Sequence, residues 1–328
     1  MMKLSTMWKV VKTVDETWAC PLAEEVLRPW GFDEGSVRFF RASANFVCVF
    51  RREGRRHFLR FSEASERPRD AIEAEARLVA WLDRQGVPVA APVPSGNGRL
   101  VETVETGLGR FYAIVFVGLE GSHLDAADCR EAEFRAWGAA LGRLHTVMKE
   151  YRDPSAAHRE TWHDHLALAL PYVSADEALH SEWLRLREWA GALPVSPDDF
   201  GLIHFDFESD NLCWNNGSIS MLDFDDCTHH WYVADIAYAL RDLFKEGVDL
   251  ANPQFRAFMA GYEGEHSVNP DLLVQLPGFL RLHVMHQLGR ISRSLDLPEG
   301  QDLPDWLKRL DTRLREIRES NRGSLLGK

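Results

Sequence analysis

The side chains best suited to chemistry lie within one stretch of the sequence, residues 201–235. His204, Asp206 and Asn211 follow one another there with the spacing H-x-D-x-x-x-x-N, and Asp223-Phe224-Asp225 comes shortly afterwards. Amide and carboxylate oxygens are hard donors that suit Mg²⁺, an ion that usually keeps several waters and takes further ligands from phosphates. A carboxylate beside metal-bound phosphates can orient a hydroxyl group and accept its proton. The stretch therefore indicates a site that transfers phosphoryl groups.

A predicted β-hairpin brings two of these side chains together. Asn216-Gly217 is a strong two-residue turn signal, and the apolar runs on either side of it are typical of two short strands. If these two residues centre the turn, residue 211 stands opposite residue 222, so that Asn211 and Asp223 are diagonal neighbours at the open end. We therefore expect Asn211 and Asp223 to hold Mg²⁺. Asp206, in the loop that enters the hairpin, is expected to be the catalytic base.

Other interpretations compete with this one. Asp and Asn are common in turns, so any one of these side chains could belong to an ordinary turn, whereas their joint spacing favours the functional interpretation. Asp225 could support the metal ligands or cap the helix that follows. His229 and His230 could belong to a loop or contact the substrate, and no third ligand is spaced for zinc. His204 is expected to be structural.

The first third of the chain, which must help to position these residues, is predicted to contain mostly strands. After one or two short helices, residues 36–62 are predicted to form a β-meander, with a polar turn around Gly54. A helix is expected over residues 69–85, because apolar residues recur there at helical spacing and Gly86 and Pro88 follow. Strands return at residues 100–105 and 110–117.

The rest of the chain is predicted to be mostly helical, with the candidate site in a small β insertion. A short apolar run at residues 202–205 leads into the site and precedes the hairpin. The predicted helices cover residues 133–151, 163–170, 176–193, 233–244, 253–263, 271–295 and 304–320. A five-stranded sheet with one helix therefore precedes a helical part, with the boundary near residues 118–121 and no long linker.

The motifs, in this order, resemble the aminoglycoside phosphotransferase and choline kinase group, a branch of the protein-kinase-like fold. The resemblance rests first on H-x-D-x-x-x-x-N and the D-x-D after it, and it extends from about Val37 to Asp242. Other segments similar to those of the family occur in the expected order: Gly86–Pro92, Leu119–Gly121, Leu141–His145 and Asp235–Ala237.

The resemblance also implies a nucleotide site. Arg60 matches the strand residue that contacts the nucleotide phosphates, and Glu75 matches the helix residue that pairs with it. Phe116 and Val117 match the strand that enters the hinge, where backbone groups meet adenine. These four residues are therefore candidates for binding ATP.

The sequence departs from the family pattern at three places. Ser43 and Asn45 lie where relatives have the nucleotide loop and are candidate nucleotide contacts, but this segment contains no glycine. Arg60 replaces the more familiar Lys, and Arg can contact phosphate bidentately. Phe205 stands where many relatives have Gly, and its bulk is expected to alter the substrate floor.

The resemblance implies an α+β, bilobal protein-kinase-like fold. A nucleotide-binding lobe with a five-stranded antiparallel sheet and one helix is expected over residues 1–117, and a mainly helical catalytic and acceptor-binding lobe over residues 118–328. ATP, with Mg²⁺, is expected between the lobes. The implied reaction moves the γ-phosphoryl group to a hydroxyl of a small molecule, for example an amine-bearing or amino-alcohol acceptor.

Three alternatives remain at this stage. One is an atypical protein serine/threonine kinase, although nothing after Asp223 resembles an activation segment. Another is a nucleotide-binding family member with weak or no catalysis, which the unusual nucleotide loop would suit. The third is a non-enzymatic scaffold that retains only the fold and does not bind ATP. Acceptor specificity is expected to lie in the helical part, where the sequence does not reveal which acceptor is used.

Composition narrows the partners. The 38 Lys and Arg against 50 Asp and Glu give a net charge of −12, which disfavours a nucleic-acid partner. No apolar run is long enough for a membrane span or a signal peptide, so we expect a cytoplasmic protein. Five cysteines at irregular spacing are typical of reduced buried thiols rather than disulfides. Nothing in the sequence indicates an oligomeric state.

Overall fold

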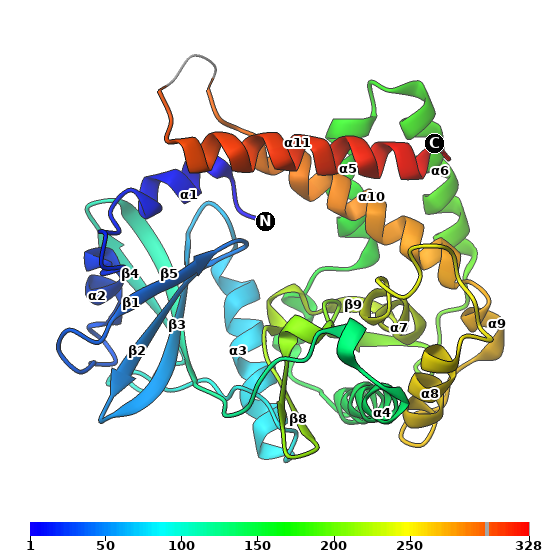
Figure 1. The fold of residues 1–328 in the computed structure, drawn as a ribbon, viewed down its shortest axis with the longest axis horizontal. Helices are drawn as coiled ribbons and strands as arrows, with labels where there is room; N and C mark the ends of the chain where they lie inside the picture. The colour runs from blue at the N-terminus through cyan, green and yellow to red at the C-terminus, as the bar shows by residue number, and fades with distance from the viewer. Residues whose placement is uncertain (299–301, 328) are drawn as a thin grey trace. The chain divides into compact units, whose positions relative to one another are not determined.

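The computed structural model describes residues 1–298 and 302–327 (Figure 1). The chain forms two compact units that are interleaved in sequence. Unit 1 consists of Met1–Arg77, Ala91–Gly118 and the described residues of Gln287–Lys328, and unit 2 consists of Leu78–Ala90 and Leu119–His286. The divisions fall within α3 (Arg69–Arg84), after Ala90, after Gly118 and within α10 (Leu276–Ser294). The division after Gly118 lies next to the boundary expected from the sequence. The described residues from Gln287 onward belong to unit 1, although the sequence analysis assigned them to the second lobe.

Unit 1 is built around one antiparallel sheet of five strands in the order β1-β2-β3-β5-β4, as the sequence predicts. Two short helices precede it, and the end of the chain returns to it. The elements are α1 (Leu4–Val11), α2 (Pro21–Leu27), β1 (Arg38–Ala42), β2 (Phe46–Arg52), β3 (Arg55–Glu63), the first half of α3, β4 (Val101–Thr106), β5 (Gly109–Val117), the end of α10 and α11 (Asp305–Leu325).

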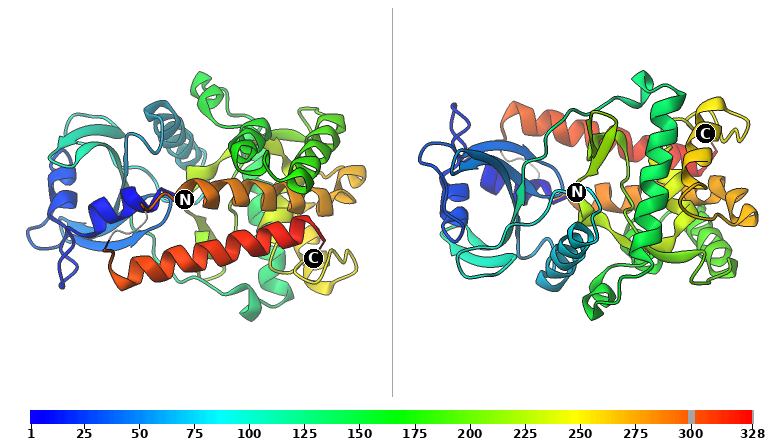
Figure 2. Two further views of the ribbon diagram at one scale, coloured as in Figure 1. Left: turned by 90° about the horizontal axis from the view of Figure 1, so that it is seen from above. Right: turned by 90° about the horizontal axis from the view of Figure 1, so that it is seen from below.

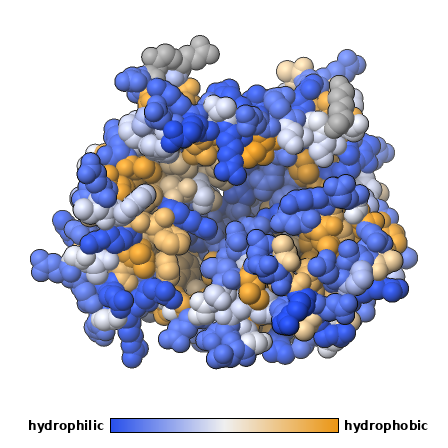
Figure 3. All heavy atoms as spheres, in the orientation of Figure 1, coloured by the Kyte–Doolittle hydropathy of each residue, from blue (hydrophilic) through white to orange (hydrophobic). Residues whose placement is uncertain are grey.

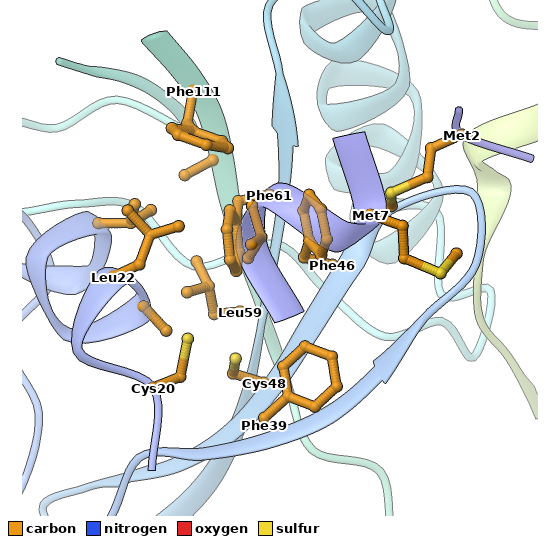
Figure 4. Close-up of a cluster of buried hydrophobic side chains, with 14 of the residues drawn as sticks. Met2, Met7, Cys20, Leu22, Phe39, Phe46, Cys48, Leu59, Phe61 and Phe111 are labelled. Carbon is orange, nitrogen blue, oxygen red and sulfur yellow. The ribbon is translucent and has the colours of Figure 1, made fainter. Parts of the chain in front are cut away.

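The alternation of side chains on β5 gives the sheet two different faces. Phe111, Ala113 and Val115 point into the main hydrophobic core of the unit, shown in Figure 4. Ile114, between them, packs with Ile72 of α3 in a second, smaller cluster on the opposite face. Helix α3 is therefore the element that covers the second face.

The main core also includes residues from the end of the chain, which sequence patterning assigned to the helical lobe. Leu307 and Leu314 of α11 are buried in it. The ring of Trp306 lies 6.0 Å from that of Trp8, between centroids, and α11 begins beside α1 (Figures 1 and 2). The apolar stripe of α11 is thus covered by the N-terminal helices and the sheet core.

Unit 2 contains most of the helices and two pairs of short strands. The elements are the second half of α3, α4 (Glu131–Met148), α5 (Trp162–Val173), α6 (Glu177–Ala192), β6 (Phe200–Ile203), β7 (Leu212–Asn215), β8 (Ser218–Met221), β9 (Thr228–Trp231), α7 (Tyr232–Ala239), α8 (Pro253–Tyr262), α9 (Pro270–Leu273) and the first part of α10. Four single-turn 3₁₀ segments, all in unit 2, accompany them: η1 (Ala126–Asp128), η2 (Pro154–His158), η3 (Ser209–Asn211) and η4 (Phe224–Asp226).

Helices α4 and α8 pack so closely that glycine is required where they touch. A Cβ atom on Gly138 would lie 1.9 Å from the carbonyl oxygen of Phe258, and one on Gly261 would lie 1.9 Å from that of Arg135. Small residues let two helix backbones approach each other in this way. This contact anchors α4, which carries His145.

One predicted helix is wrong, and one strand was not predicted. The single helix predicted over residues 271–295 is two helices, α9 and α10, separated by Val274 and Gln275. The apolar run at residues 202–205 is a strand only as far as Ile203, the end of β6, and β9, which pairs with β6, was not predicted. The amides of residues 204 and 205 are bonded to a side chain, which ends the strand early.

Much of the face shown in Figure 3 is hydrophilic, with hydrophobic residues in small patches among charged ones. No helix within the described residues is both long and apolar enough to cross a bilayer. All five cysteines are buried free thiols.

Candidate active site

The hairpin of unit 2 has the predicted register. Strands β7 and β8 pair Leu212 with Met221 and Asn215 with Ser218, and the turn residues Asn216 and Gly217 have φ angles of 49° and 82°. Two positive φ angles in a two-residue loop are typical of a type I′ turn, whose twist matches that of the strands. The amide of Leu222 donates to the carbonyl oxygen of Asn211 at 3.1 Å. Asn211 therefore stands next to the position that precedes Asp223.

Asp206 and Asn211 form a direct contact. The side-chain nitrogen Nδ2 of Asn211 donates to the backbone oxygen of Asp206 at 2.8 Å and to Oδ2 of its carboxylate at 3.1 Å. Asn211 is buried, and because its nitrogen faces Asp206, its amide oxygen points to the other side. The side chain of Asp206 is 33% exposed, so a substrate can reach it.

A buried carboxylate holds the loop that precedes Asp206. Both oxygens of Asp235, on α7, accept hydrogen bonds of 2.8 Å from the amides of His204 and Phe205. The same carboxylate contacts Nε2 of His145 at 3.0 Å, and His145 in turn contacts the hydroxyl of Tyr262. The segment from His204 to Asn211, called the catalytic loop below for its proposed role, is thereby linked to helices α4, α7 and α8.

Phe205 has φ of +73°, a conformation that glycine adopts freely and a bulky residue adopts only under strain. Its ring is 2% exposed and packs against His165, Tyr238 and His286. The ring of Phe205 therefore points into the interior of unit 2, and the expected effect of its bulk on the substrate floor stays a prediction.

The ring of His204 braces the end of the hairpin, as expected. Its Nε2 contacts the carbonyl oxygen of Leu222 at 3.1 Å. Burial lowers the pKa of His204, with the nearby charge of Asp235 acting in the opposite direction. Asp223, next in the chain, has φ of +64°, in the left-handed region that Asp tolerates better than most residues.

Arg241, two residues beyond the end of α7, connects two acidic groups of the catalytic loop. Its Nη1 lies 3.4 Å from Oδ1 of Asp206, and its Nη2 donates to Glu208. Burial raises the pKa of Glu208 to about 7, and the negative charge of Asp206 adds to this, while Arg241 opposes it. Sequence reasoning missed Arg241, and its position shortly after Asp235 was the available signal.

Arg159 holds the segment that follows Asp223. This buried guanidinium donates to the carbonyl oxygens of Cys227 at 2.7 Å, Asp225 at 2.5 Å and Phe224 at 3.4 Å. Arg159 lies in the connection between α4 and α5, far away in sequence, so no local pattern pointed to it. Its hydrogen bonds satisfy backbone carbonyl groups of residues 224–227, in place of the hydrogen bonds that a longer helix or strand would supply.

The open assignments around Asp225 and the two histidines are narrowed. Asp225 lies inside η4, and α7 begins only after β9, so Asp225 does not cap that helix. His229 and His230 lie on β9 rather than in a loop. His229 contacts the carbonyl oxygen of Ala156, and His230 is fully buried against Tyr238. His230 therefore cannot contact a substrate at the surface.

The predicted nucleotide residues lie in unit 1, and two of them form an ion pair. Arg60 on β3 and Glu75 on α3 make a bidentate pair, with Nη1 donating to Oε1 at 2.8 Å and Nη2 to Oε2. Both side chains are buried, and the guanidinium also lies 5.2 Å from the ring centre of Phe116. Arg60 points toward α3 because its neighbours Leu59 and Phe61 point into the main core.

Two other residues predicted to bind the nucleotide, Asn45 and Val117, make hydrogen bonds within unit 1. Asn45 is buried and accepts a hydrogen bond from Ser62, and Ser43 lies in the turn between β1 and β2. The amide of Val117 donates to the carbonyl oxygen of Ala91 at 3.0 Å. An adenine contact from Val117 would therefore have to use its carbonyl oxygen.

The donor set at the hairpin fits a magnesium ion. Asn211 offers an amide oxygen and Asp223 a carboxylate, both of the hard type that Mg²⁺ prefers, and the register places them at adjacent ends of the strands. Within residues 1–298 and 302–327, no three His, Cys, Asp or Glu side chains are grouped to hold a metal. Two protein ligands leave positions for water and phosphate, which is the usual arrangement for Mg²⁺.

Comparison with known proteins agrees with this geometry. Residues 36–270 match the phosphotransferase enzyme family. The chain is 30% identical over 287 residues to the amicoumacin kinase of Bacillus subtilis (strain 168), covering 84% of this chain and 85% of that protein.

Solved structures show the same fold. The amicoumacin kinase hAmiN, in complex with AMP-PNP, Ca²⁺ and Ami, has a TM-score of 0.76 at 25% identity, covering 94% of this chain and 95% of that one. A microcompartment-associated aminopropanol kinase has a TM-score of 0.63 at 20% identity, with 93% and 97% covered. A spectinomycin phosphotransferase with ADP and spectinomycin has 0.59 at 14% identity, with 92% and 97% covered.

Proposed function

We propose, from the premise that this chain belongs to the phosphotransferase enzyme family, that Asp206 is the catalytic base of its phosphoryl transfer. The predicted family resemblance and the kinase-like α+β fold are confirmed. The protein is a small-molecule kinase that moves phosphate from ATP to a hydroxyl group. The observation that carries the role of Asp206 is its hydrogen bond from Asn211, together with its partly exposed side chain in a loop that Asp235 holds.

The residues have distinct tasks in this proposal. The hydroxyl of the acceptor donates to the carboxylate of Asp206, and Asp206 takes the proton as the acceptor oxygen bonds to the γ-phosphorus. The bond between that phosphorus and the bridging oxygen breaks, and ADP leaves with the electron pair. Asn211 and Asp223 would hold Mg²⁺, which neutralises phosphate charge when bound.

Arg60 and Glu75 act on the nucleotide side. A guanidinium held by a bidentate carboxylate is fixed in direction, and guanidinium is a group that recognises phosphate. ATP is the phosphoryl donor in this proposal, with a divalent cation, since the solved amicoumacin kinase carries AMP-PNP and Ca²⁺. Because ATP is a cytoplasmic metabolite, we place the protein in the cytoplasm.

For the acceptor, we propose amicoumacin or a compound of the same kind. The support is the 30% identity to an amicoumacin kinase over most of both chains. The aminopropanol and spectinomycin enzymes share the fold only, and a shared fold does not choose a substrate. An amine-bearing acceptor also suits the half-buried carboxylates Asp206 and Glu208 at this site.

The test is an assay of ADP release and product mass with amicoumacin, aminopropanol and spectinomycin, using Mg-ATP. We expect amicoumacin to gain one phosphoryl group and Asp206→Asn to slow the transfer by about 100- to 10,000-fold, which leaves a measurable residual rate. Phosphorylation of another acceptor would overturn the acceptor assignment but keep the kinase. Full activity of Asp206→Asn would overturn the assignment of the base.

Metal and nucleotide binding can be checked separately. Mg-ATP at a hundred times its dissociation constant should stabilise the folded protein by about 2.7 kcal/mol, seen as a rise in Tm. Asp223→Ala should reduce this rise, because a ligand of the metal is lost. An equal rise in the variant would count against Asp223 as a metal ligand. No rise in the wild type would show that the protein does not bind Mg-ATP and would count against ATP as its phosphoryl donor.

A further inference from the structure

Helix α7 contacts the catalytic loop at both of its ends, through groups of opposite charge. Near its start, Asp235 accepts the amides of His204 and Phe205 at 2.8 Å. Beyond its end, Arg241 reaches the carboxylates of Asp206 and Glu208. The first contact fixes the backbone of the loop, whereas the second acts on its side chains.

We infer that Arg241 is a positioning residue that fixes the carboxylate of Asp206 for proton transfer. This inference rests on the proposed role of Asp206 as the base and adds the group that orients it. A carboxylate on a single-bonded side chain rotates unless both of its oxygens are held. Here Nδ2 of Asn211 lies 3.1 Å from Oδ2, and Nη1 of Arg241 lies 3.4 Å from Oδ1.

Arg241 is itself held in place. Its Nη1 donates to the carbonyl oxygen of Tyr238 at 3.0 Å, and its Nη2 donates to Glu208. These two contacts use two different nitrogens of one planar guanidinium, a geometry that Lys cannot reproduce. Glu208 thus anchors the guanidinium, and the side chain of Arg241 is only 26% exposed.

The charges around the loop make this arrangement necessary. Asp206, Glu208 and Asp210 follow one another within five residues, and like charges at this spacing repel. A guanidinium between the first two lets both carboxylates stay in place without turning away from each other. Removing it should let Asp206 leave the position in which it meets the acceptor hydroxyl.

Substitution of Arg241 should lower the rate of the reaction rather than weaken the binding of ATP or the acceptor. A displacement of about 1 Å at a reacting group can cost about 100-fold, so Arg241→Gln should lower kcat by about that factor. The KM values for ATP and acceptor should stay within about threefold, because a group acting in the transition state alone changes kcat. Arg241→Lys should restore part of kcat, since it keeps the charge and loses the fork.

The experiment measures Mg-ATP turnover, with amicoumacin as acceptor and with water as acceptor, together with Tm. The single variants are Arg241→Gln, Arg241→Lys, Glu208→Gln and Asp206→Asn. The double variant combines Asp206→Asn with Arg241→Gln. The matched control is Arg185→Gln, because Arg185 also pairs with a glutamate in unit 2, Glu182 on α6, away from the catalytic loop. The control should turn over as the wild type does.

We expect Arg241→Gln to have no further effect once Asp206 is Asn, because it acts through that carboxylate. Wild-type kcat in Arg241→Gln, an equal loss in both backgrounds, or a loss confined to acceptor KM would each overturn the inference. If Arg241→Gln does not fold, Arg241→Lys and Glu208→Gln decide in the same way. If Asp206→Asn turns over normally, the proposed function fails first, and Arg241 has no base to position.

Discussion

At the scale of single residues, Phe205 combines backbone strain with a buried ring. A φ of +73° disfavours any side chain at this position, yet the ring lies between α5, α7 and α10 within unit 2. The two amide bonds to Asp235 hold the loop in this conformation. The packing of the ring must outweigh the strain, and the two effects can be separated by substitution.

We predict that Phe205→Ala and Phe205→Gly both destabilise the protein, by about 3–5 kcal/mol for the lost ring in the alanine variant. Glycine should be the less harmful of the two by about 1 kcal/mol, because only alanine retains the strain of a Cβ at positive φ. This order reverses the usual preference for alanine. Denaturant unfolding of both variants measures it, and a more stable alanine variant would show that the backbone is not strained.

At the scale of elements, the close packing of α4 against α8 positions the helix that carries His145. Gly261 and Gly138 face backbone oxygens at distances that leave no room for a side chain. Gly191, on α6, has no atom within 4 Å of an added Cβ and has no positive φ. These two settings allow the same substitution to be compared where space is absent and where it is present.

Gly261→Ala should destabilise unit 2 by about 1–3 kcal/mol, because the two helices must separate to admit a methyl group. Gly191→Ala is the matched control and should be neutral or stabilising by up to about 1 kcal/mol, since alanine is the better helix former. Urea titrations followed by circular dichroism give both values. Equal effects of the two substitutions would mean that α4 and α8 are not in such close contact.

Arg159 also acts at the scale of elements, because it lies outside the segment that it holds. It bonds to three carbonyl oxygens around η4, while the hairpin itself is held by its own register and turn. Asp223, the proposed metal ligand, therefore depends on two kinds of support. One is local in sequence and can be recognised from it, and the other comes from the connection between α4 and α5.

At the scale of the whole molecule, buried histidines connect stability to pH. Burial, with His145 and Lys149 nearby, lowers the pKa of His266 from 6.5 to about 4, and burial lowers that of His230 well below 6.5. Both are neutral in the folded protein, whereas both take up protons near pH 6.5 once unfolded. The unfolded state therefore binds more protons in acid, and stability falls as pH decreases.

We predict that the free energy of unfolding is highest above pH 6.5 and declines between pH 6.5 and about 4. His266 alone should account for roughly 3 kcal/mol over that range. His266→Gln should flatten the decline, while His158→Gln, at an exposed position in unit 2, should leave it unchanged. Unfolding in urea at a series of pH values gives the slopes, and identical slopes for both variants would contradict the assignment.

Much of the catalytic hairpin could be predicted from the sequence, because its determinants are local. The Asn216-Gly217 turn sets the register, the register places Asn211 near Asp223, and the spacing places Asp206 at the entrance. The pairing of Arg60 with Glu75 was expected from the family resemblance rather than from a local pattern, and the two side chains form that ion pair. Periodicity and turn chemistry act over a few residues, so they can be recognised along the chain.

Only the tertiary structure showed the contacts made between distant segments. Arg241 on Asp206, Arg159 on the Asp223 segment and the return of α11 to the core of unit 1 join residues that no local pattern relates. The physical reason is that a buried polar or apolar group requires a partner, but many different residues could provide it. A buried carboxylate needs a donor and an apolar stripe needs cover, and the sequence alone does not specify which distant group supplies them.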